Sequence, residues 1–269
     1  MLHLPESRWK AFATHIAVSA LLFIFLAGVI YFLWYPGFLF EYDGGLEGIR
    51  LIAGVDFLIG PILTLCIYKL GKPGLKFDLV VIALLQIACL SGGMYTVWKT
   101  RPVAVVYASG QFRTISYQTY SDYGINPQEN AIFSGRWPIW FAVKETPSEH
   151  VEETAGFVEK FYHQTEAFFK VDSYVPYDSY LDEIRKASVS VSKVVTFRPD
   201  LRDVLNQYGD DALIYELASG AGSGYLFMDQ QYQIQGVAIV SARKSAYAIA
   251  LAKCQEFLVK HLNLLSEKR

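Results

Sequence analysis

One stretch of the chain, residues 48–72, is apolar enough to cross a bilayer but carries a carboxylate and a helix-breaking pair. A helix that crosses the hydrocarbon core needs about 20 mostly apolar residues. Asp56 would cost about 2.5–3.5 kcal/mol there on insertion scales, so it is expected to face protein or water. Pro61, after Gly60, removes one backbone hydrogen bond and predicts a kink, and the Thr64 hydroxyl is placed to bond the freed carbonyl. The stretch therefore predicts a membrane helix that packs against a specific partner.

Hydrophobic residues make up 52% of the 269-residue chain and are concentrated near its start. They form three runs, at about 11–35, 49–70 and 79–98. The first run is longer than the apolar core of a secretory signal and ends in an aromatic cluster typical of a membrane interface, so it predicts an uncleaved anchor. We expect a membrane protein with three N-terminal transmembrane helices, in a region over 1–98, followed by a soluble domain over 99–269.

The charges around these runs predict the orientation of the chain. Basic residues precede the first run at Arg8 and Lys10 and lie between the second and third at Lys69, Lys72 and Lys76. The loop at 36–47, between the first two runs, is acidic. The positive-inside rule then places the N-terminus in the cytoplasm and the domain after the third span in the periplasm of a two-membrane bacterium, with the spans in the inner membrane.

The remainder of the chain predicts an α+β domain with an antiparallel sheet. Val103–Tyr107 and Gln111–Gln118 flank Ser109-Gly110, which is a hairpin signal. Further strands are predicted over 137–144, 212–218, 225–229 and 233–240. The last three, with a Gly-rich turn between the first two of them, predict an antiparallel meander.

Helices are predicted over 146–170, 177–186, 200–208 and 242–265. The first begins with Thr146 as a cap, Pro147 at its first position and acidic residues in the first turn. The last carries an apolar stripe at three- and four-residue steps, which fits either a core-facing helix or a seam for a partner helix.

No residue pattern predicts an enzyme, a cofactor or a metal site. Glu159, His163 and Glu166 share one helix face at a spacing that could hold a metal, but such residues are ordinary on an exposed face. Asp56 and Asp78 cannot form an aspartyl protease dyad, because about 20 Å of helix separates Asp56 from the inner end of its span. The net charge of −2 and the lack of basic runs give no sign of nucleic-acid binding.

Several short motifs are spaced over residues 5–115. They are Asp56-x-x-x-Gly60-Pro61-x-x-Thr64-Leu65, Lys72-x-x-x-Lys76-Phe77-Asp78-Leu79, Leu85-Gln86, Gly92 or Gly93, and Arg101-Pro102-Val103. Together they resemble the type IV pilin accessory protein family, of the TfpX/TfpZ type. The resemblance implies an inner-membrane protein that assists pilin stability or pilus assembly without catalysis. The segment 242–269 departs from the pattern, in which the chain ends near the last strand.

The resemblance directs attention to the membrane motif. We expect Asp56 and the Gly60-Pro61 kink either to form a groove for the apolar helix of the major pilin or to hold the three-helix bundle together. Gln86, in the third run, matches Asp56 in depth and is its expected polar partner.

Two further sets of residues lie at the predicted membrane boundaries. The first, a cytoplasmic corner, comprises Lys72, Lys76, Phe77 and Asp78, and its basic residues fit contact with anionic headgroups. Arg101-Pro102 marks the junction of membrane region and domain, with Arg101 expected at the headgroups. The expected partners are the major type IV pilin, inner-membrane pilus assembly components and the lipid bilayer, with no nucleic acid.

A competing interpretation is a membrane-anchored periplasmic sensor or ligand-binding module. It predicts a pocket in the domain over 99–269. Aromatic residues that could line it are Trp137, Trp140, Tyr174, Tyr177 and Tyr180. With ten residues before the first run and a tight cytoplasmic turn, such a sensor would have to signal through a partner.

Overall fold

The computed structural model describes residues 6–54, 60–144, 166–209 and 211–242. The chain divides into two compact units. The helical unit contains residues 1–40 and 44–99, and the sheet unit contains residues 41–43 and 100–243. Residues 41–43 therefore belong to the sheet unit, although both of their sequence neighbours belong to the helical unit.

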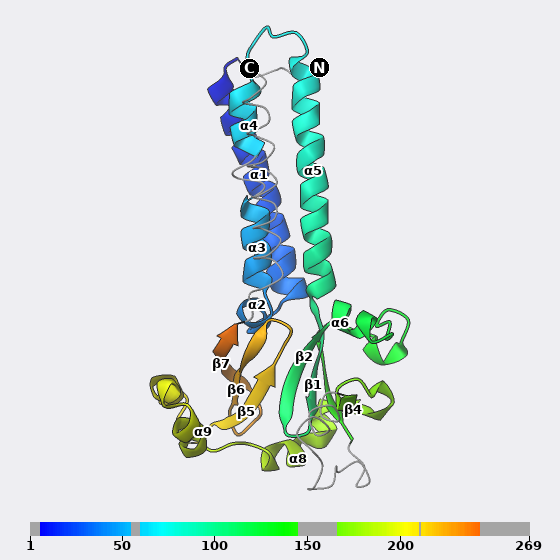
Figure 1. The fold of residues 1–269 in the computed structure, drawn as a ribbon, viewed down its shortest axis with the longest axis vertical. Helices are drawn as coiled ribbons and strands as arrows, with labels where there is room; N and C mark the ends of the chain where they lie inside the picture. The colour runs from blue at the N-terminus through cyan, green and yellow to red at the C-terminus, as the bar shows by residue number, and fades with distance from the viewer. Residues whose placement is uncertain (1–5, 55–59, 145–165, 210, 243–269) are drawn as a thin grey trace. The chain divides into compact units, whose positions relative to one another are not determined.

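The first part of the chain forms long apolar helices (Figure 1). Its elements are α1 (Arg8–Val29), the π-helical turn η1 (Ile30–Trp34), α2 (Leu39–Tyr42), α3 (Gly45–Ala53), α4 (Gly60–Ile67) and α5 (Leu75–Thr100). Arg8–Trp34 and Leu75–Thr100 are each long and apolar enough to cross a membrane. The predicted span at 49–70 is described as α3 and α4, with residues 55–59 outside the described part, so it stays a prediction.

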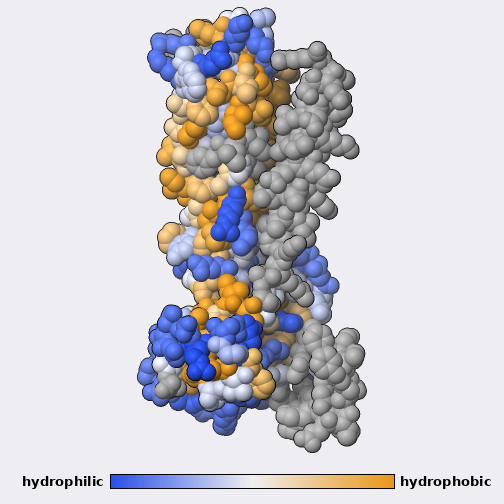
Figure 2. All heavy atoms as spheres, turned by 60° about the vertical axis from the view of Figure 1, so that its left-hand side comes forward, coloured by the Kyte–Doolittle hydropathy of each residue, from blue (hydrophilic) through white to orange (hydrophobic). Residues whose placement is uncertain are grey.

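Most apolar side chains of the two long helices point outward. In the most apolar 18-residue segment of Arg8–Trp34, only 11% of the residues are buried. In the corresponding segment of Leu75–Thr100, 6% are buried. Large side chains such as Leu21, Phe25 and Leu84 are exposed, and Figure 2 shows broad hydrophobic areas on the helical part of the surface. A core helix of a soluble protein would be mostly buried instead, so this surface indicates membrane anchoring.

A small apolar cluster packs the helices of this unit together. Its buried members are Ile30, Tyr35, Ile52 and Val97. Tyr35 donates a hydrogen bond to the Val97 carbonyl at 3.1 Å, which links the end of the first long helix to α5. Gly48 permits α3 to approach α5, because a Cβ there would lie 3.0 Å from a Val97 methyl group.

The sheet unit contains a seven-stranded mixed sheet of order β4-β3-β1-β2-β5-β6-β7. The strands are β1 (Pro102–Ala108), β2 (Gln111–Ser116), β3 (Ile139–Val143), β4 (Tyr174–Pro176), β5 (Leu213–Ala218), β6 (Gly222–Met228) and β7 (Ile234–Ala242). The predicted hairpin around Ser109-Gly110 is the antiparallel pair β1–β2. The predicted meander is β5–β6–β7, which is also antiparallel.

The prediction of an antiparallel sheet is wrong for two pairings. Strand β1 pairs in parallel with β3, and β2 pairs in parallel with β5. Parallel neighbours need a long crossover connection, and the chain supplies one in each case. Residues 117–138 return the chain to β3, and residues 117–212 separate β2 from β5. A hairpin signal reports only on strands that are adjacent in sequence, so it could not predict these pairings.

The helices of the sheet unit are short. They are α6 (Tyr117–Asp122), η3 (Ala131–Phe133), η5 (Val171–Ser173), η6 (Tyr177–Tyr180), α8 (Leu181–Lys186), α9 (Val191–Phe197), η7 (Pro199–Leu201) and α10 (Arg202–Leu205). The helices expected at 177–186 and 200–208 are therefore present as η6–α8 and η7–α10. The helix expected over 242–265 lies outside the described residues beyond Ala242, which ends β7, and most of that expected over 146–170 lies outside them too.

The two faces of the sheet carry different side chains, because successive residues of a strand point to opposite faces. One face carries two hydrophobic clusters, around Phe141 and around Ile214. The opposite face, here called the aromatic face, is centred on the buried Phe112. Its ring centroid lies 5.1 Å from that of Tyr107, 5.8 Å from that of Trp140 and 5.2 Å from that of Tyr215.

Candidate functional site

A short chain of hydrogen bonds joins α1 to α4 inside the apolar helical unit. His15 Nδ1 and Thr64 Oγ1 lie 2.6 Å apart, and Thr64 Oγ1 donates to the Gly60 carbonyl at 3.1 Å. With the Thr64 proton on the Gly60 carbonyl, the His15 tautomer that carries its proton on Nδ1 completes this chain. We expected Thr64 to bond the carbonyl freed by Pro61. That carbonyl belongs to Phe57, outside the described residues, and the hydroxyl bonds Gly60 instead.

Gly60 and Gln86 bring α4 and α5 into contact. Gly60 is buried, and a Cβ at this position would overlap the side-chain amide of Gln86. Gln86 was the expected partner of Asp56, which lies outside the described residues, so that pairing stays a prediction. The structure thus brings Gly60, Thr64 and Gln86 together and adds His15, which the sequence reasoning missed. The sequence did contain a clue to this contact. Lys10 is five residues from His15 and Lys69 is five residues from Thr64, and these basic residues lie at the same end of the predicted helices.

The predicted cytoplasmic corner forms the turn between α4 and α5. Lys72 Nζ and Asp78 Oδ2 form an ion pair of 2.7 Å. Gly74, with a φ of +83°, turns the chain immediately before α5. Lys76 and Phe77 are both exposed at the start of α5, and Phe77 retains 71% of its accessible surface. The ion pair fixes the turn, and the exposed Lys76 and Phe77 are accessible to a headgroup or a partner.

The junction at Arg101 and Pro102 differs in part from expectation. Helix α5 ends at Thr100 and Pro102 begins β1, as the proline predicted. The Arg101 side chain, however, is buried in the sheet unit rather than exposed to headgroups. Its guanidinium carbon lies 4.7 Å from the ring centroid of Trp137 and 5.4 Å from that of Tyr117. Both rings stabilise the buried guanidinium.

Tyr42, in the segment 41–43, docks onto the strands of the sheet unit. Its hydroxyl donates to the Leu217 carbonyl at 2.6 Å and lies 3.4 Å from the Gly222 carbonyl. Gly224 of β6 leaves space for the ring, because a Cβ at Gly224 would lie 3.3 Å from it. The segment is therefore held by contacts specific to this tyrosine.

Asp43 is the second anchor of the segment. Thr114 Oγ1, on the aromatic face, donates to Asp43 Oδ1 at 2.7 Å. The other carboxyl oxygen, Oδ2, is shielded from solvent and has no hydrogen-bond partner among the described residues. Burial raises the pKa of Asp43 to about 7, against smaller lowering effects of the Thr114 and Ser219 hydroxyls. The sequence showed only that the loop at 36–47 is acidic.

A pocket of about 380 Å³ is lined by aromatic side chains of the sheet unit. Its walls include the rings of Trp140, Tyr177 and Tyr232, with Met228, Ile234 and the carboxyl of Asp178. Two of the five aromatic residues that were expected to line a pocket, Trp140 and Tyr177, do so. Tyr174 instead lies in the opposite hydrophobic cluster, and Trp137 contacts Arg101.

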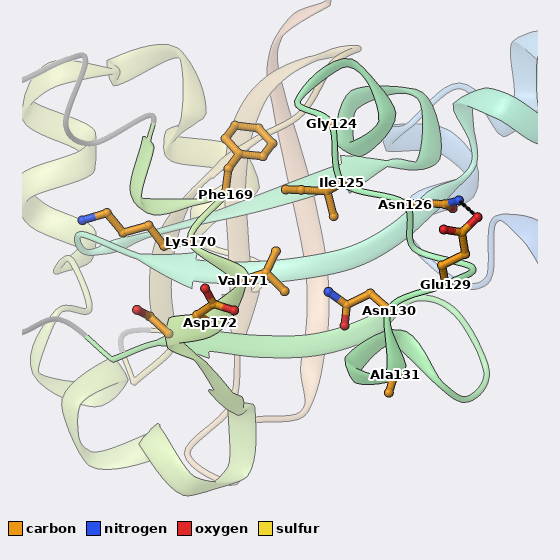
Figure 3. A pocket seen from close by; sticks show the side chains of 11 residues that line it. Gly124, Ile125, Asn126, Glu129, Asn130, Ala131, Phe169, Lys170, Val171 and Asp172 are labelled. Atoms are coloured by element: carbon orange, nitrogen blue, oxygen red, sulfur yellow. Dashed lines mark hydrogen bonds between the residues drawn. The ribbon is translucent and has the colours of Figure 1, made fainter.

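A wider hollow of about 870 Å³ lies between the loop after α6 and the segment around η5 (Figure 3). Its loop amides are engaged in the loop itself: Asn126 donates to Glu129 at 2.7 Å, and Asn130 Oδ1 accepts from the Ile132 N–H at 3.1 Å. Nor do the described residues include a group of three or more His, Cys, Asp or Glu that could hold a metal. This hollow therefore shows no converging set of ligand groups.

Known proteins similar to this chain share one description. The chain is 30% identical over 192 residues to the fimbrial assembly protein of serogroup I from Dichelobacter nodosus, covering 66% of this chain and 70% of that protein. The serogroup E1 protein of the same organism is 29% identical over 190 residues, with the same coverage. The chain belongs to the fimbrial assembly protein family. A third member, the protein of serogroups C1 and C2 of Dichelobacter nodosus, is 34% identical over 115 residues. The aligned region covers 40% of this chain and 83% of that protein.

Membership of the fimbrial assembly protein family agrees with the pilus part of the resemblance seen in the motifs. No family model matches the chain, and no solved structure does. The description of the chain's candidate sites therefore rests on its own residues. The chain offers two candidate sites: the polar site in the helices, formed by His15, Gly60, Thr64 and Gln86, and the aromatic pocket of the sheet unit.

Proposed function

We propose that this fimbrial assembly protein is a non-enzymatic accessory of the TfpX/TfpZ type in type IV pilus biogenesis. It binds pilin subunits in the bacterial inner membrane and modulates their assembly. Its family supports a role in fimbrial biogenesis. The observation that carries the pilin-binding part is the half-buried Gln86 amide, which lies in an apolar helix and has no hydrogen-bond partner among the described residues.

An amide in an apolar helix is costly in lipid unless it is bonded, so it favours a polar partner, which Asp56 or a second helix would supply. Gly60 beside it lets α4 and α5 approach closely, so the amide is held at the contact of the two helices. The long helices α1 and α5 also expose large apolar side chains such as Leu21, Phe25 and Leu84, which suit a second apolar helix. Pilin subunits are held in the inner membrane by such a helix, which is why we propose pilin as the occupant.

The membership of residues 41–43 in the sheet unit supports the predicted orientation. Both 41–43 and 100–243 must lie on one side of the membrane, because they form one unit. If Arg8–Trp34 and Leu75–Thr100 each cross the bilayer, the chain between 44 and 74 must cross it once as well. Three spans follow, with the N-terminus and the Lys72–Asp78 corner together on the other side, which the basic residues assign to the cytoplasm.

A photo-crosslinking amino acid at Leu63 tests the proposed pilin site in native cells. Leu63 flanks the buried Gly60 and Thr64, whereas Ile62, two residues from Gly60, is exposed on the other side of α4. We expect crosslinks to the major pilin from Leu63 and few from Ile62, which is the matched control. Equal yields at both positions, or no pilin at either, would contradict the proposed site.

The aromatic pocket supports a second candidate function, a ligand-binding or sensing module that acts through a partner. Trp140 and Tyr177, both predicted for such a pocket, line it. The two candidates are separated by deletion of the gene followed by complementation with a Tyr177→Leu variant. If the protein only holds pilin and the pocket is unused, the Tyr177→Leu variant should assemble pili normally. If the pocket senses a ligand, the variant should lose control of pilus assembly, although pilin still crosslinks at Leu63.

A further inference from the structure

The aromatic pocket has a wall residue in an uncommon backbone conformation. Tyr232 has a φ of +60°, in the left-handed region that glycine and asparagine adopt most easily. A surrounding turn holds it there: Asp229 Oδ1 accepts from the N–H groups of Gln231 and Gln233 at 2.8 Å each, and Tyr232 N–H bonds the Asp229 carbonyl at 3.0 Å. The chain thus keeps a bulky ring where a smaller residue would fit with less strain.

The tyrosine side chain at 232 has a defined position as well. Its hydroxyl donates to the Leu181 carbonyl at 2.9 Å and accepts from Arg185 Nε at 2.9 Å. Arg185 is also bonded to Gln230, through Oε1 at 2.8 Å and the carbonyl at 2.9 Å. These bonds anchor α8 through the phenol oxygen, and the ring of Tyr232 lines the pocket.

The other walls give the pocket the chemistry of a cation site. Trp140 and Tyr177 present two more rings, with centroids 5.4 Å apart at an interplanar angle of 63°. Aromatic rings attract cations through their negative faces, and a Lys or Arg side chain bound against them gains about 0.5–2 kcal/mol. Asp178 is the one ionisable carboxyl among the lining residues. Arg185 is not among the lining residues, but its guanidinium carbon lies 5.2 Å from the ring centroid of Tyr232, so Trp140 and Tyr177 are the rings offered to an incoming cation.

The aromatic face also carries a buried hydroxyl that is unpaired among the described residues. Tyr215 Oη, on the aromatic face, has no hydrogen bond among the described residues. Burial is the main cause that raises the pKa of Tyr215; Tyr177 and Tyr232, which line the pocket, raise it further, and Arg185 lowers it.

The position of the pocket in the sheet favours a cation presented on a polypeptide. Its lining includes Pro176 of β4 and Ile234 of β7, the strands at the two ends of the sheet order. Within the described residues each of these strands pairs with a single neighbour. Edge strands bind extended segments through main-chain hydrogen bonds, while pockets beside them select side chains.

We propose that this pocket binds a lysine or arginine side chain presented by an extended segment of a protein partner. Trp140, Tyr177 and Tyr232 form the aromatic walls, Asp178 pairs with the charge, and the edge of β7 or β4 bonds the segment. The inference does not depend on pilin binding in the membrane, because it concerns other residues in the other unit.

Fluorescence polarisation with labelled peptides and the detergent-solubilised full-length protein tests this inference. The probe is an acetylated Val-Thr-Lys-Thr-Val peptide, and the matched controls replace its lysine with norleucine or glutamate. We expect the lysine peptide to bind most tightly, the norleucine peptide about threefold to thirtyfold more weakly, and the glutamate peptide not measurably. Tetramethylammonium chloride should compete with the lysine peptide beyond the effect of equal sodium chloride.

Two variants locate the binding in the pocket. Tyr177→Leu removes a ring and should weaken lysine-peptide binding about threefold to thirtyfold. Asp178→Asn, at an exposed position that leaves the fold intact, should weaken it about twofold to fivefold and reduce its salt dependence. Equal binding of lysine and norleucine peptides, no binding of any peptide, or full binding by Asp178→Asn at low salt would each overturn the proposal.

Discussion

At the scale of single residues, Asp43 is the side chain whose environment departs most from its sequence context. It lies in an acidic loop but is buried against Thr114, with one carboxyl oxygen unbonded among the described residues. Its pKa is raised to about 7 by burial, whereas an unfolded aspartate titrates near 3.9. Between these two values the folded protein holds a proton that the unfolded chain has released.

This difference fixes the sign of a pH dependence. The free energy of unfolding of the sheet unit should fall as the pH rises from about 4 to about 7, and level off above that range. Asp43→Asn keeps an acceptor for Thr114 but cannot ionise, so it should remove this slope and raise stability at neutral pH. Urea unfolding of the detergent-solubilised protein, followed by tryptophan fluorescence at several pH values, measures it.

Tyr42→Phe provides the control for this measurement. It removes the hydrogen bond to the Leu217 carbonyl, which should lower stability by about 0.5–1.5 kcal/mol at every pH. The slope between about pH 4 and pH 7 should remain in this variant. A slope that persists in Asp43→Asn would show that another group is responsible for it.

Thr64 offers a second test at the residue scale. Thr64→Val keeps the shape of the side chain but removes the hydroxyl that links His15 to the Gly60 carbonyl. Interhelical hydrogen bonds in membranes contribute about 0.6 kcal/mol on average, so a loss of about 0.5–1.5 kcal/mol is expected. Thermal unfolding in detergent measures it, and Thr64→Ser, which keeps the hydroxyl, should stay near the wild type.

At the scale of elements, the contact between α4 and α5 depends on the absence of a side chain at Gly60. Gly60→Leu would force the Gln86 amide and then α5 to move, and overpacking of this kind costs about 1–3 kcal/mol. Gly92→Leu is the matched control, because a Cβ at Gly92 meets no other atom within 4 Å. We expect lower membrane abundance and thermal stability for Gly60→Leu alone. Equal losses in both variants would place the effect in insertion rather than in packing.

The elements that could be predicted from the sequence are those whose signals are local. The β1–β2 hairpin follows from Ser109-Gly110, and the meander β5–β6–β7 follows from apolar runs around a Gly-rich turn. Strand β4 has only three residues, too few to show alternation. Helix α9 is rich in β-branched residues, so its propensity favours a strand, and packing of Val194 into the core outweighs it.

The candidate sites were less predictable, because they depend on contacts between distant segments. Gly60, Thr64 and Gln86 could be identified as a motif, but the bond between His15 and Thr64 joins residues 49 positions apart. The docking of Tyr42 on the Leu217 carbonyl spans 175 positions. Neither bond leaves a local pattern, and only the shared depth of His15 and Thr64 in antiparallel helices was available as a clue.

At the scale of the whole molecule, the path of the chain between its two units constrains the proposed topology. Residues 41–43 and 100–243 share a unit, so a marker in either segment must have the same accessibility. A marker in the turn between α4 and α5 must have the opposite accessibility if three spans cross the membrane. This relation holds whichever side is cytoplasmic, and the basic residues near the N-terminus then select the side.

Single cysteines in a variant without native cysteines test this topology. Suitable exposed positions are Glu41, Lys76 and Gln231. A membrane-impermeant maleimide added to cells with a permeabilised outer membrane should label Glu41→Cys and Gln231→Cys but not Lys76→Cys. Lys76→Cys should react only after the inner membrane is opened, which controls for its intrinsic reactivity. Labelling of Lys76→Cys before that step would leave α3 and α4 on the periplasmic side, and Gln86 would then lack the three-helix setting on which the pilin site depends.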